Sequence, residues 1–181
     1  PPAPSLPRCG HSPPPARRRA PPAAPPQPAT LGYNVAMIAL IQRVSSASVE
    51  VDGATIGVIG AGLLALVGVR PADDAASGAR LLERLLSYRV FPDAADRMNR
   101  SLRDTGGGLL LVPQFTLTAD TRGGTRPGFS TAAPPEQART LFEQLVAAAR
   151  AAHPEVASGR FGADMRVALV NEGPVTFWLE S

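Results

Sequence analysis

The stretch "MIALIQRVSSASVEVDGATIGVIGAGLLALVGV" (residues 37–69) decides the fold class of this chain. It consists of short apolar or alternating runs, separated by Asp52-Gly53 and by Gly60-Ala61-Gly62. Alternating runs bounded by such turn residues are typical of β-hairpins. We therefore expect a strand, a hairpin turn, a second strand, another hairpin turn and a buried third strand.

The segments that follow predict two amphipathic helices. Residues 73–90 carry apolar side chains at helical spacing, and a later helix begins with Pro134-Pro135-Glu136 in its first turn. The apolar stripe of the first helix is Ala79, Leu82, Leu86 and Val90, with Arg80, Glu83 and Arg84 facing away. The stripe of the second is Ala138, Leu141, Phe142, Leu145, Val146 and Ala149.

Further strands complete the pattern. The run "GGGLLLVPQFTL" (106–117) reads as a second buried strand, in which Gln114 and Thr116 are two residues apart and so share a face. Two final strands are expected at about 164–170 and 175–180. Strands outnumber helices, and the helices can cover only one side of the sheet. We expect a compact single α/β domain of layered or barrel-like sheets with helices packed on one side.

Residues 1–36 differ in composition from the rest of the chain. They hold 12 of the 20 prolines and are otherwise mostly alanine and arginine, a composition that predicts a disordered N-terminal extension before a domain at residues 37–181. The formal charge of +3 originates there, because the remaining chain has 14 arginines against 15 acidic residues. Net charge therefore indicates little about the partners of the domain.

Several kinds of chemistry are excluded by composition. The single cysteine, Cys9, and one of the two histidines, His11, lie in the extension, and His153 stands alone near the end of a helix. We therefore expect no disulfide in the domain and no metal site of thiolates or histidines. A Ser-His-Asp triad or a Cys-His dyad is not expected either. No nucleotide-binding glycine motif and no apolar run of about 18 residues is present. An enzyme of this sequence would work without a cofactor, through hydroxyls, amides and backbone groups.

Four short segments concentrate such groups. "PQFTL" (113–117) ends a buried strand, and "RGGTRPGFS" (122–130) suits a phosphate-bearing ligand with a stacked base, or a solvated loop. "RFGADM" (160–165) places an aromatic residue at a strand entrance, for the core or for a site. "NEGPVTFWLES" (171–181) puts Gly-Pro before a strand, either as an ordinary strand start or as shaped backbone at a site. By base rate alone its X-Pro bond would be trans.

Taken together, "IQRVSSASVEVDG", "QFTLTADTRGGTRPGFSTAAPPE", "GRFGADM" and "NEGPVTFWLES" closely resemble the D-aminoacyl-tRNA deacylase family, collinearly from about residue 37 to 181. The resemblance implies a cytoplasmic homodimer that binds the 3′ end of aminoacyl-tRNA and needs no metal, cofactor or membrane. Such a protein hydrolyses the ester of D-aminoacyl-tRNA, releasing tRNA and the D-amino acid, as chiral proofreading in translation.

The resemblance also implies roles for particular residues. Gly173 and Pro174 would form a cis selector that reaches into the other subunit's pocket and excludes L side chains, so that achiral glycyl-tRNA would be hydrolysed too. Gln114, Phe115 and Thr116 would form the catalytic motif, with backbone N–H groups as an oxyanion site and Thr116 positioning the substrate rather than attacking it. The terminal ribose 2′-hydroxyl would assist water. The substrate and adenosine pocket would be formed by Phe129, Ala132, Phe161, Gly162, Met165 and Asn171.

One departure from the family pattern keeps alternatives open. Pro113 stands where the family usually has serine, and proline removes a backbone N–H and fixes φ near −65°. A related animal-type deacylase reads Pro-Gln there and removes L-alanine, although Phe115 and "NEGPVT" favour the D-specific branch. A nucleic-acid-binding module with the same fold, aided by the arginines of the extension, is the other alternative.

Overall fold

The computed structural model describes residues 36–181. The predicted extension at residues 1–36 therefore lies outside the described residues except for Ala36, and the domain boundary stays a prediction. The main sheet contains β1 (Ile38–Val51), β2 (Ala54–Ile59), β3 (Gly62–Gly68), β6 (Gly108–Pro113), β7 (Val156–Ser158) and β8 (Arg166–Glu180). β4 (Phe91–Pro92) and β5 (Met98–Arg100) form a small second sheet. The helices are α1 (Ala75–Ser87), α2 (Leu102–Thr105), the 3₁₀ helix η1 (Phe115–Thr118) and α3 (Pro135–Ala152).

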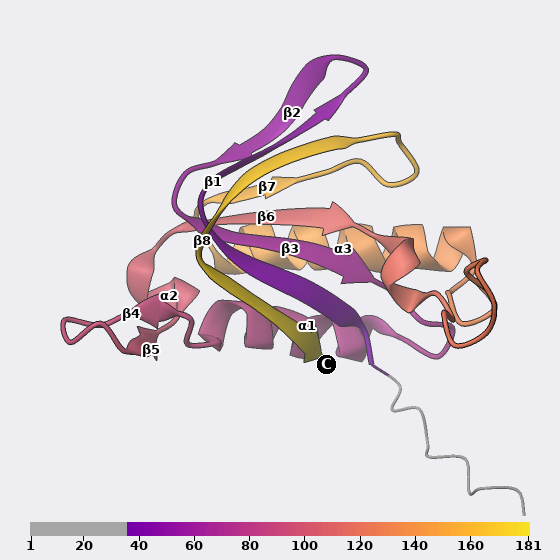
Figure 1. Cartoon of the computed structure of the whole chain (residues 1–181), viewed down its shortest axis with the longest axis horizontal. Helices are drawn as coiled ribbons and strands as arrows, with labels where there is room; N and C mark the ends of the chain where they lie inside the picture. The colour runs from indigo at the N-terminus through magenta and orange to yellow at the C-terminus, as the bar shows by residue number, and fades with distance from the viewer. Residues whose placement is uncertain (1–35) are drawn as a thin grey trace, which may run out of the picture. The chain divides into compact units, whose positions relative to one another are not determined.

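The long strand β1 organises the sheet (Figure 1). Its first half pairs antiparallel with β3 and its second half with β2, whereas β8 pairs along its other edge from Ile38↔Glu180 to Glu50↔Arg166. β6 continues the sheet parallel to β3, and the short β7 is parallel to β6. The strands fan out and curl, with α1 and α3 on one side (Figure 1). The predicted α/β class with a barrel-like sheet is confirmed.

Two apolar cores explain why the central strands are apolar throughout. Alternate residues of β3 and β6, such as Leu63 and Leu109, face α1 and α3, while Leu64 and Leu110 face a second core on the other side of the sheet. Side chains on a strand alternate between faces, so a strand buried on both faces reads as a continuous apolar run. The run "LLLV" of β6 is therefore fully buried.

The predicted helices are confirmed with small changes. In α3 the buried residues are those of the predicted stripe. In α1 the side chain of Asp74 caps the N–H of Ser77 at 2.8 Å, and the helix ends at Ser87, earlier than predicted. Ala79 is exposed rather than buried, whereas Leu81 and Leu85 lie in the core. The apolar face is thus rotated slightly from the predicted one.

Three predictions about strands are wrong. β2 and β3 do not form a hairpin at Gly60-Ala61-Gly62, because both run antiparallel to β1 and follow one another along the same edge of it. The two predicted final strands are one strand, β8, and the predicted strand 106–117 ends at Pro113. The short elements β4, β5, α2 and β7 were not predicted. Gly62 allows the close approach of β3 to β6, since a Cβ there would lie 1.9 Å from the carbonyl oxygen of Gly108.

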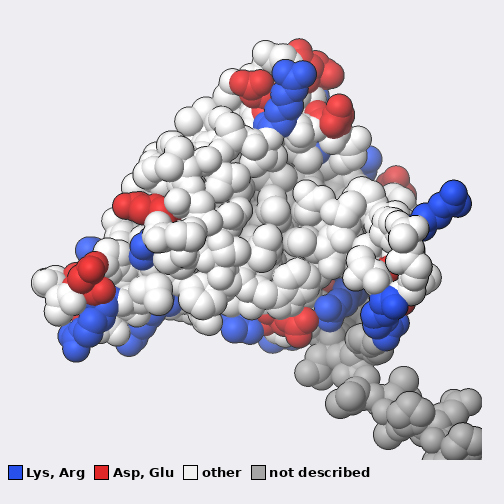
Figure 2. Space-filling view, viewed as in Figure 1, with Lys and Arg blue, Asp and Glu red and all other residues white. Residues whose placement is uncertain are grey.

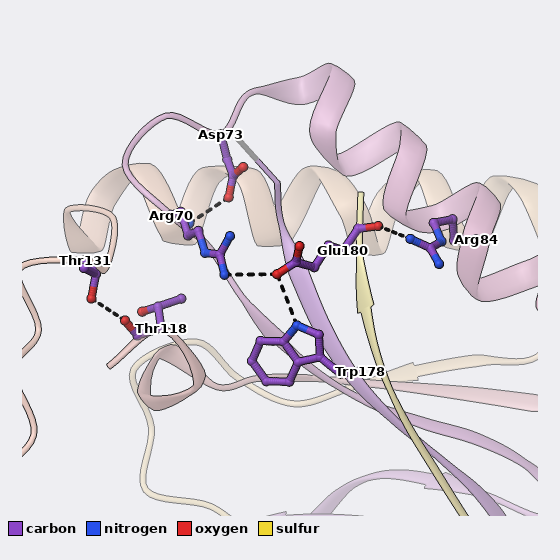
Figure 3. Close-up of polar contacts among 7 residues, drawn as sticks. All are labelled: Arg70, Asp73, Arg84, Thr118, Thr131, Trp178 and Glu180. Carbon is purple, nitrogen blue, oxygen red and sulfur yellow. Dashed lines mark hydrogen bonds and ion pairs between the residues drawn. The ribbon is translucent and has the colours of Figure 1, made fainter. Parts of the chain in front are cut away.

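The end of β8 is fastened to the helical side of the domain (Figure 3). The carboxylate of Glu180 accepts hydrogen bonds from Arg70 and from the indole N–H of Trp178, each at 3.2 Å. Arg84 of α1 donates to the carbonyl oxygen of Glu180. The N–H of Arg70 donates to Asp73 at 2.7 Å, and burial raises the pKa of that carboxyl. These contacts fix the C-terminal strand against α1.

Candidate active site

Gln114, Phe115 and Thr116 lie at the carboxyl end of β6. The N–H of Gln114 donates to the carbonyl of Val67 at 2.7 Å, after which the chain turns into η1. The prediction that Gln114 and Thr116 share a strand face is therefore wrong. The tight 3₁₀ turn nevertheless brings them together, because the Gln114 amide donates to the Thr116 hydroxyl. Phe115 projects outward, with 55% of its surface exposed.

The start of η1 presents two free backbone donors. The first N–H groups of a helix have no acceptor within it. Among the described residues, the N–H groups of Phe115 and Thr116 have no other backbone or side-chain acceptor, whereas those of Leu117 and Ala119 bond to preceding carbonyls. Two adjacent free donors are the kind of group that stabilises a developing oxyanion.

Pro113 occupies a position that tolerates proline. The N–H of Gln114 points to β3, where it donates to the carbonyl of Val67. Because successive backbone N–H groups of a strand point to opposite edges, the nitrogen of Pro113 points toward β7. The last paired residues of β6 and β7 are Leu111 and Ser158, so β7 has ended before Pro113 is reached. The N–H of Gly159 donates the last hydrogen bond between the two segments, to the carbonyl of Leu111 at 2.8 Å, and Pro113 lies beyond it, where a strand tolerates proline.

A cavity of about 270 Å³ adjoins this turn. The Phe161 cavity, as we name it, is lined by Pro113, Gln114 and Phe115 on one side and by the loop between β7 and β8 on the other. The residues from that loop include Phe161, Gly162, Ala163 and Met165. The fold thus brings the predicted Gln-Phe segment together with Phe161, Gly162 and Met165, which are 45 or more residues away in sequence. None of the side chains lining the cavity is titratable.

The loop at residues 119–133 packs on η1. The rings of Phe115 and Phe129 lie 5.1 Å apart, and Thr131 donates to the carbonyl of Thr118 (Figure 3). The N–H of Ala132 donates to the carbonyl of Phe129 at 3.1 Å. Phe129 and Ala132 therefore lie beside the Gln-Phe-Thr segment, although neither lines the Phe161 cavity.

The carboxylate closest in sequence to this segment is engaged by an arginine. The side chain and the N–H of Arg122 donate to Asp120, and they hold the pKa of that carboxyl well below its usual range. A carboxylate of such low basicity is a poor general base. Asp120 also pairs through its backbone with Gly128, closing the loop. His153 is buried, with Nε2 2.6 Å from the carbonyl of Gly107, which precedes the first residue of β6.

Gly173 and Pro174 form a bulged loop in β8. Four residues of β8 stand between Asn171 and Thr176, opposite Arg43 alone on β1. The Gly173-Pro174 peptide bond is cis, and Gly173 has φ of +123°. The cis geometry agrees with the family resemblance and differs from the base-rate expectation.

Two side chains hold this loop. Arg43 donates to the carbonyl of Glu172 at 3.2 Å and to that of Val90 at 2.7 Å. Asn171 donates to the Thr176 hydroxyl at 3.0 Å and accepts from the N–H of Val175. Asn171 therefore braces the Gly-Pro loop and does not line the Phe161 cavity, where the resemblance had grouped it. Arg43 was not predicted, although an arginine between the apolar runs of the first strand was a usable signal.

Within one chain the Gly-Pro loop and the Gln-Phe-Thr segment lie level with opposite ends of β3. Arg43, opposite the loop, pairs with Leu63 at the start of β3, whereas Pro113 pairs with Val67 at its end. These two positions on β3, Leu63 and Val67, are four residues apart, which corresponds to about 13 Å along the strand. One chain does not bring the two motifs together.

Within residues 36–181, neither a metal-binding group nor a membrane-spanning helix is found. No group of three or more His, Cys, Asp or Glu side chains in this range could hold a metal ion. No helix in it has the length and hydropathy needed to cross a membrane.

Comparison with known proteins identifies relatives along the whole domain. The model of the family described as "D-Tyr-tRNA(Tyr) deacylase" matches residues 40–180. A D-aminoacyl-tRNA deacylase of Azotobacter vinelandii is 66% identical over 145 residues, which are 80% of this chain and all of the relative. One of Ectopseudomonas mendocina is 65% identical over 80% of this chain and 99% of the relative.

Solved structures agree with the fold. A structure named c-Myc DNA unwinding element binding protein has a TM-score of 0.76 and 35% identity, covering 80% of this chain and 98% of that one. A probable eukaryotic D-amino acid tRNA deacylase has a TM-score of 0.73 at 15% identity, with 81% and 100% covered, which supports the fold alone. With the family match over residues 40–180 and relatives at about two-thirds identity, the chain belongs to the D-aminoacyl-tRNA deacylase family of hydrolases.

Proposed function

We propose that this protein hydrolyses the ester of D-aminoacyl-tRNA in the cytoplasm, as a chiral proofreader in translation. The observation that carries the proposal is the pair of free N–H groups at Phe115 and Thr116, beside the Phe161 cavity. In this arrangement the terminal adenosine packs between Phe161 and Met165, and the ester carbonyl faces the two donors. Preorganised donors of this kind are worth roughly 3 to 4 kcal/mol of transition-state stabilisation each.

Thr116 acts in this proposal as a positioning group. A nucleophilic hydroxyl needs a base that accepts its proton. The Thr116 hydroxyl instead accepts a hydrogen bond from the Gln114 amide, which has no basic nitrogen. Attack by water, assisted by the 2′-hydroxyl of the terminal ribose, is consistent with a cavity lined by no titratable side chain.

Chiral selection is assigned to Gly173 and Pro174 of a second copy of the chain. About 13 Å along β3 separates the loop from the Gln-Phe-Thr segment of its own chain, so in this proposal the loop acts on the Gln-Phe-Thr segment of a second copy. Two features support association. β8 carries the exposed side chains Val170 and Trp178. Charged side chains lie mainly around the edge of the face in Figure 2 and leave its middle uncharged. Backbone carbonyls at the loop would bind the substrate amino group and exclude an L side chain, so glycyl-tRNA would also be cleaved.

The test is deacylation of matched D-tyrosyl-, L-tyrosyl-, L-alanyl- and glycyl-tRNA by the full chain. Cleavage of the D and glycyl esters with L-tyrosyl-tRNA left intact is expected. Release of L-alanine would instead assign the sister activity that Pro113 suggested. The same preparation in analytical ultracentrifugation should sediment as a dimer, and a monomer with full activity would contradict selection across the interface.

A nucleic-acid-binding role without hydrolysis is a second candidate. The observation in its favour is the 35% identical relative whose name describes binding to a DNA unwinding element. Removing residues 1–36 separates the two functions, because a binder that uses the arginines of that segment would lose affinity and salt dependence. A deacylase would keep its turnover, and a tail-dependent rate of deacylation would contradict our assignment of the domain.

A further inference from the structure

A second concave region adjoins the Phe161 cavity. This groove of about 410 Å³ lies between α3 and the segment that follows β7, and the ring of Phe161 forms part of the wall of both. Arg139, Arg150 and Arg160 line it, with Glu143 as its single acidic side chain. We refer to it as the arginine groove.

The guanidinium groups of the arginine groove are available for a ligand. All three arginines are exposed, and within residues 36–181 none forms an ion pair. Arg150 donates only a long hydrogen bond of 3.4 Å to the Ser158 hydroxyl. Arg139 lies over the ring of Phe161, 5.2 Å from its centroid. By contrast, the arginines that form ion pairs, such as Arg103 with Glu83, lie away from the groove.

The arrangement matches the backbone of a nucleic acid strand. Arginine binds phosphate through a planar array of donors, and proteins that bind single strands combine a basic groove with aromatic side chains on which bases stack. Here three unpaired arginines adjoin an aromatic ring that also borders the cavity assigned to the terminal adenosine. We propose that the arginine groove binds the phosphodiester groups of the single-stranded 3′ end that leads into the Phe161 cavity. This inference rests on the proposed function for the position of the adenosine.

Binding of uncharged tRNA tests the groove independently of catalysis. The double variant Arg150→Ala/Arg160→Ala is compared with Arg80→Ala/Arg89→Ala, which removes two exposed arginines from α1 and the turn after it. Dissociation constants are measured by fluorescence anisotropy from 50 to 300 mM salt. Each phosphate contact with a single strand contributes about 0.7 to the slope of log K against log salt, so the groove variant should lose about 1.4. Equal slopes in both variants would overturn the proposal.

A gain in affinity provides a test that misfolding cannot imitate. Glu143→Gln removes the only carboxylate of the groove, so it should tighten tRNA binding about two- to fivefold at low salt and less at high salt. Glu155→Gln, a matched change at an exposed position outside the groove, should not. No gain for Glu143→Gln relative to Glu155→Gln would count against phosphate binding there.

Turnover separates this inference from the proposed function. Deacylation is measured with D-tyrosyl-tRNA and with the minimal ester 3′-O-(D-tyrosyl)adenosine, which has no phosphodiester. For Arg150→Ala/Arg160→Ala the loss in kcat/KM on tRNA should exceed the loss on the minimal ester at least tenfold. Equal losses would refute the groove while leaving the hydrolase intact. Failure of the unmodified protein to cleave either ester would refute the proposed function, and the salt slopes would still decide the groove.

Discussion

Replacing Gly173 by alanine should impair chiral selection more than stability. Gly173 has φ of +123°, which residues with a Cβ rarely adopt, and a Cβ there would lie 2.8 Å from Val175 Cγ2 and 3.0 Å from Arg43 Nη2. Backbone held in such a region costs about 1–3 kcal/mol. If the loop relaxes to avoid that cost, its selecting conformation becomes about 5- to 150-fold less populated.

The assay is single-turnover deacylation of D-tyrosyl- and L-tyrosyl-tRNA, together with Tm. The ratio of the D rate to the L rate should fall by a factor within that range. Strain retained by the fold would instead lower Tm by about 2–4 °C for each kcal/mol. Gly60→Ala is the control, because a Cβ at this exposed turn meets nothing within 4 Å. Unchanged rates on both enantiomers in Gly173→Ala would refute the assigned role of the loop.

Three further outcomes follow from the contacts. Thr116→Ala should keep kcat for D-tyrosyl-tRNA within about tenfold of the parent, because its hydroxyl positions rather than attacks; complete loss with unchanged circular dichroism would support covalent catalysis. Arg43→Ala should lower the D-to-L rate ratio, since Glu172 and Val90 lose a charged donor, and Arg43→Lys should lower it less; equal ratios in all three proteins would contradict a bracing role. The N–H of Arg97 and the amide of Asn99 hold the pKa of Asp93 at about 2. Because the folded-state pKa of Asp93 is lowered, its carboxylate stabilises the protein at pH values above the unfolded pKa near 3.9. The decrease in Tm caused by Asp93→Asn should therefore be complete above about pH 4 and disappear as the pH falls through 2. A decrease in Tm that does not depend on pH would contradict this prediction.

The elements that could be predicted from sequence are those with a strong local period. In α3, apolar residues recur at helical spacing behind a proline-containing first turn, and the same six residues are buried. The apolar run of β6 identified a strand buried on both faces. β4, β5 and β7 are two or three residues long and carry no period, so they form only because neighbouring segments supply their partners.

The turn at Gly60-Ala61-Gly62 shows a limit of local reasoning. Glycines between two apolar runs are typical of a hairpin, yet β2 and β3 run in the same direction along β1. Gly62 is required not for a turn but for close packing, because its backbone lies against that of Gly108, which is distant in sequence. A close approach between strands of this kind has no local signature.

For the candidate site, composition indicated a chemistry of hydroxyl, amide and backbone groups. The particular residues were proposed from the family resemblance. The sequence by itself determined that residues 37–181 contain no cysteine and a single histidine, that a buried apolar strand ends near the Gln-Phe-Thr segment, and that the motifs resemble one family from residue 37 to 181. These follow from composition, short-range periodicity and motif order, which a chain carries before it folds. Tertiary structure decided which distant segments meet: Phe161 with Phe115 around one cavity, and three arginines beside it, whereas Gly173 lies level with the other end of β3. Such contacts depend on strand pairing and on which face of the sheet each side chain takes, and a single shift of register changes both.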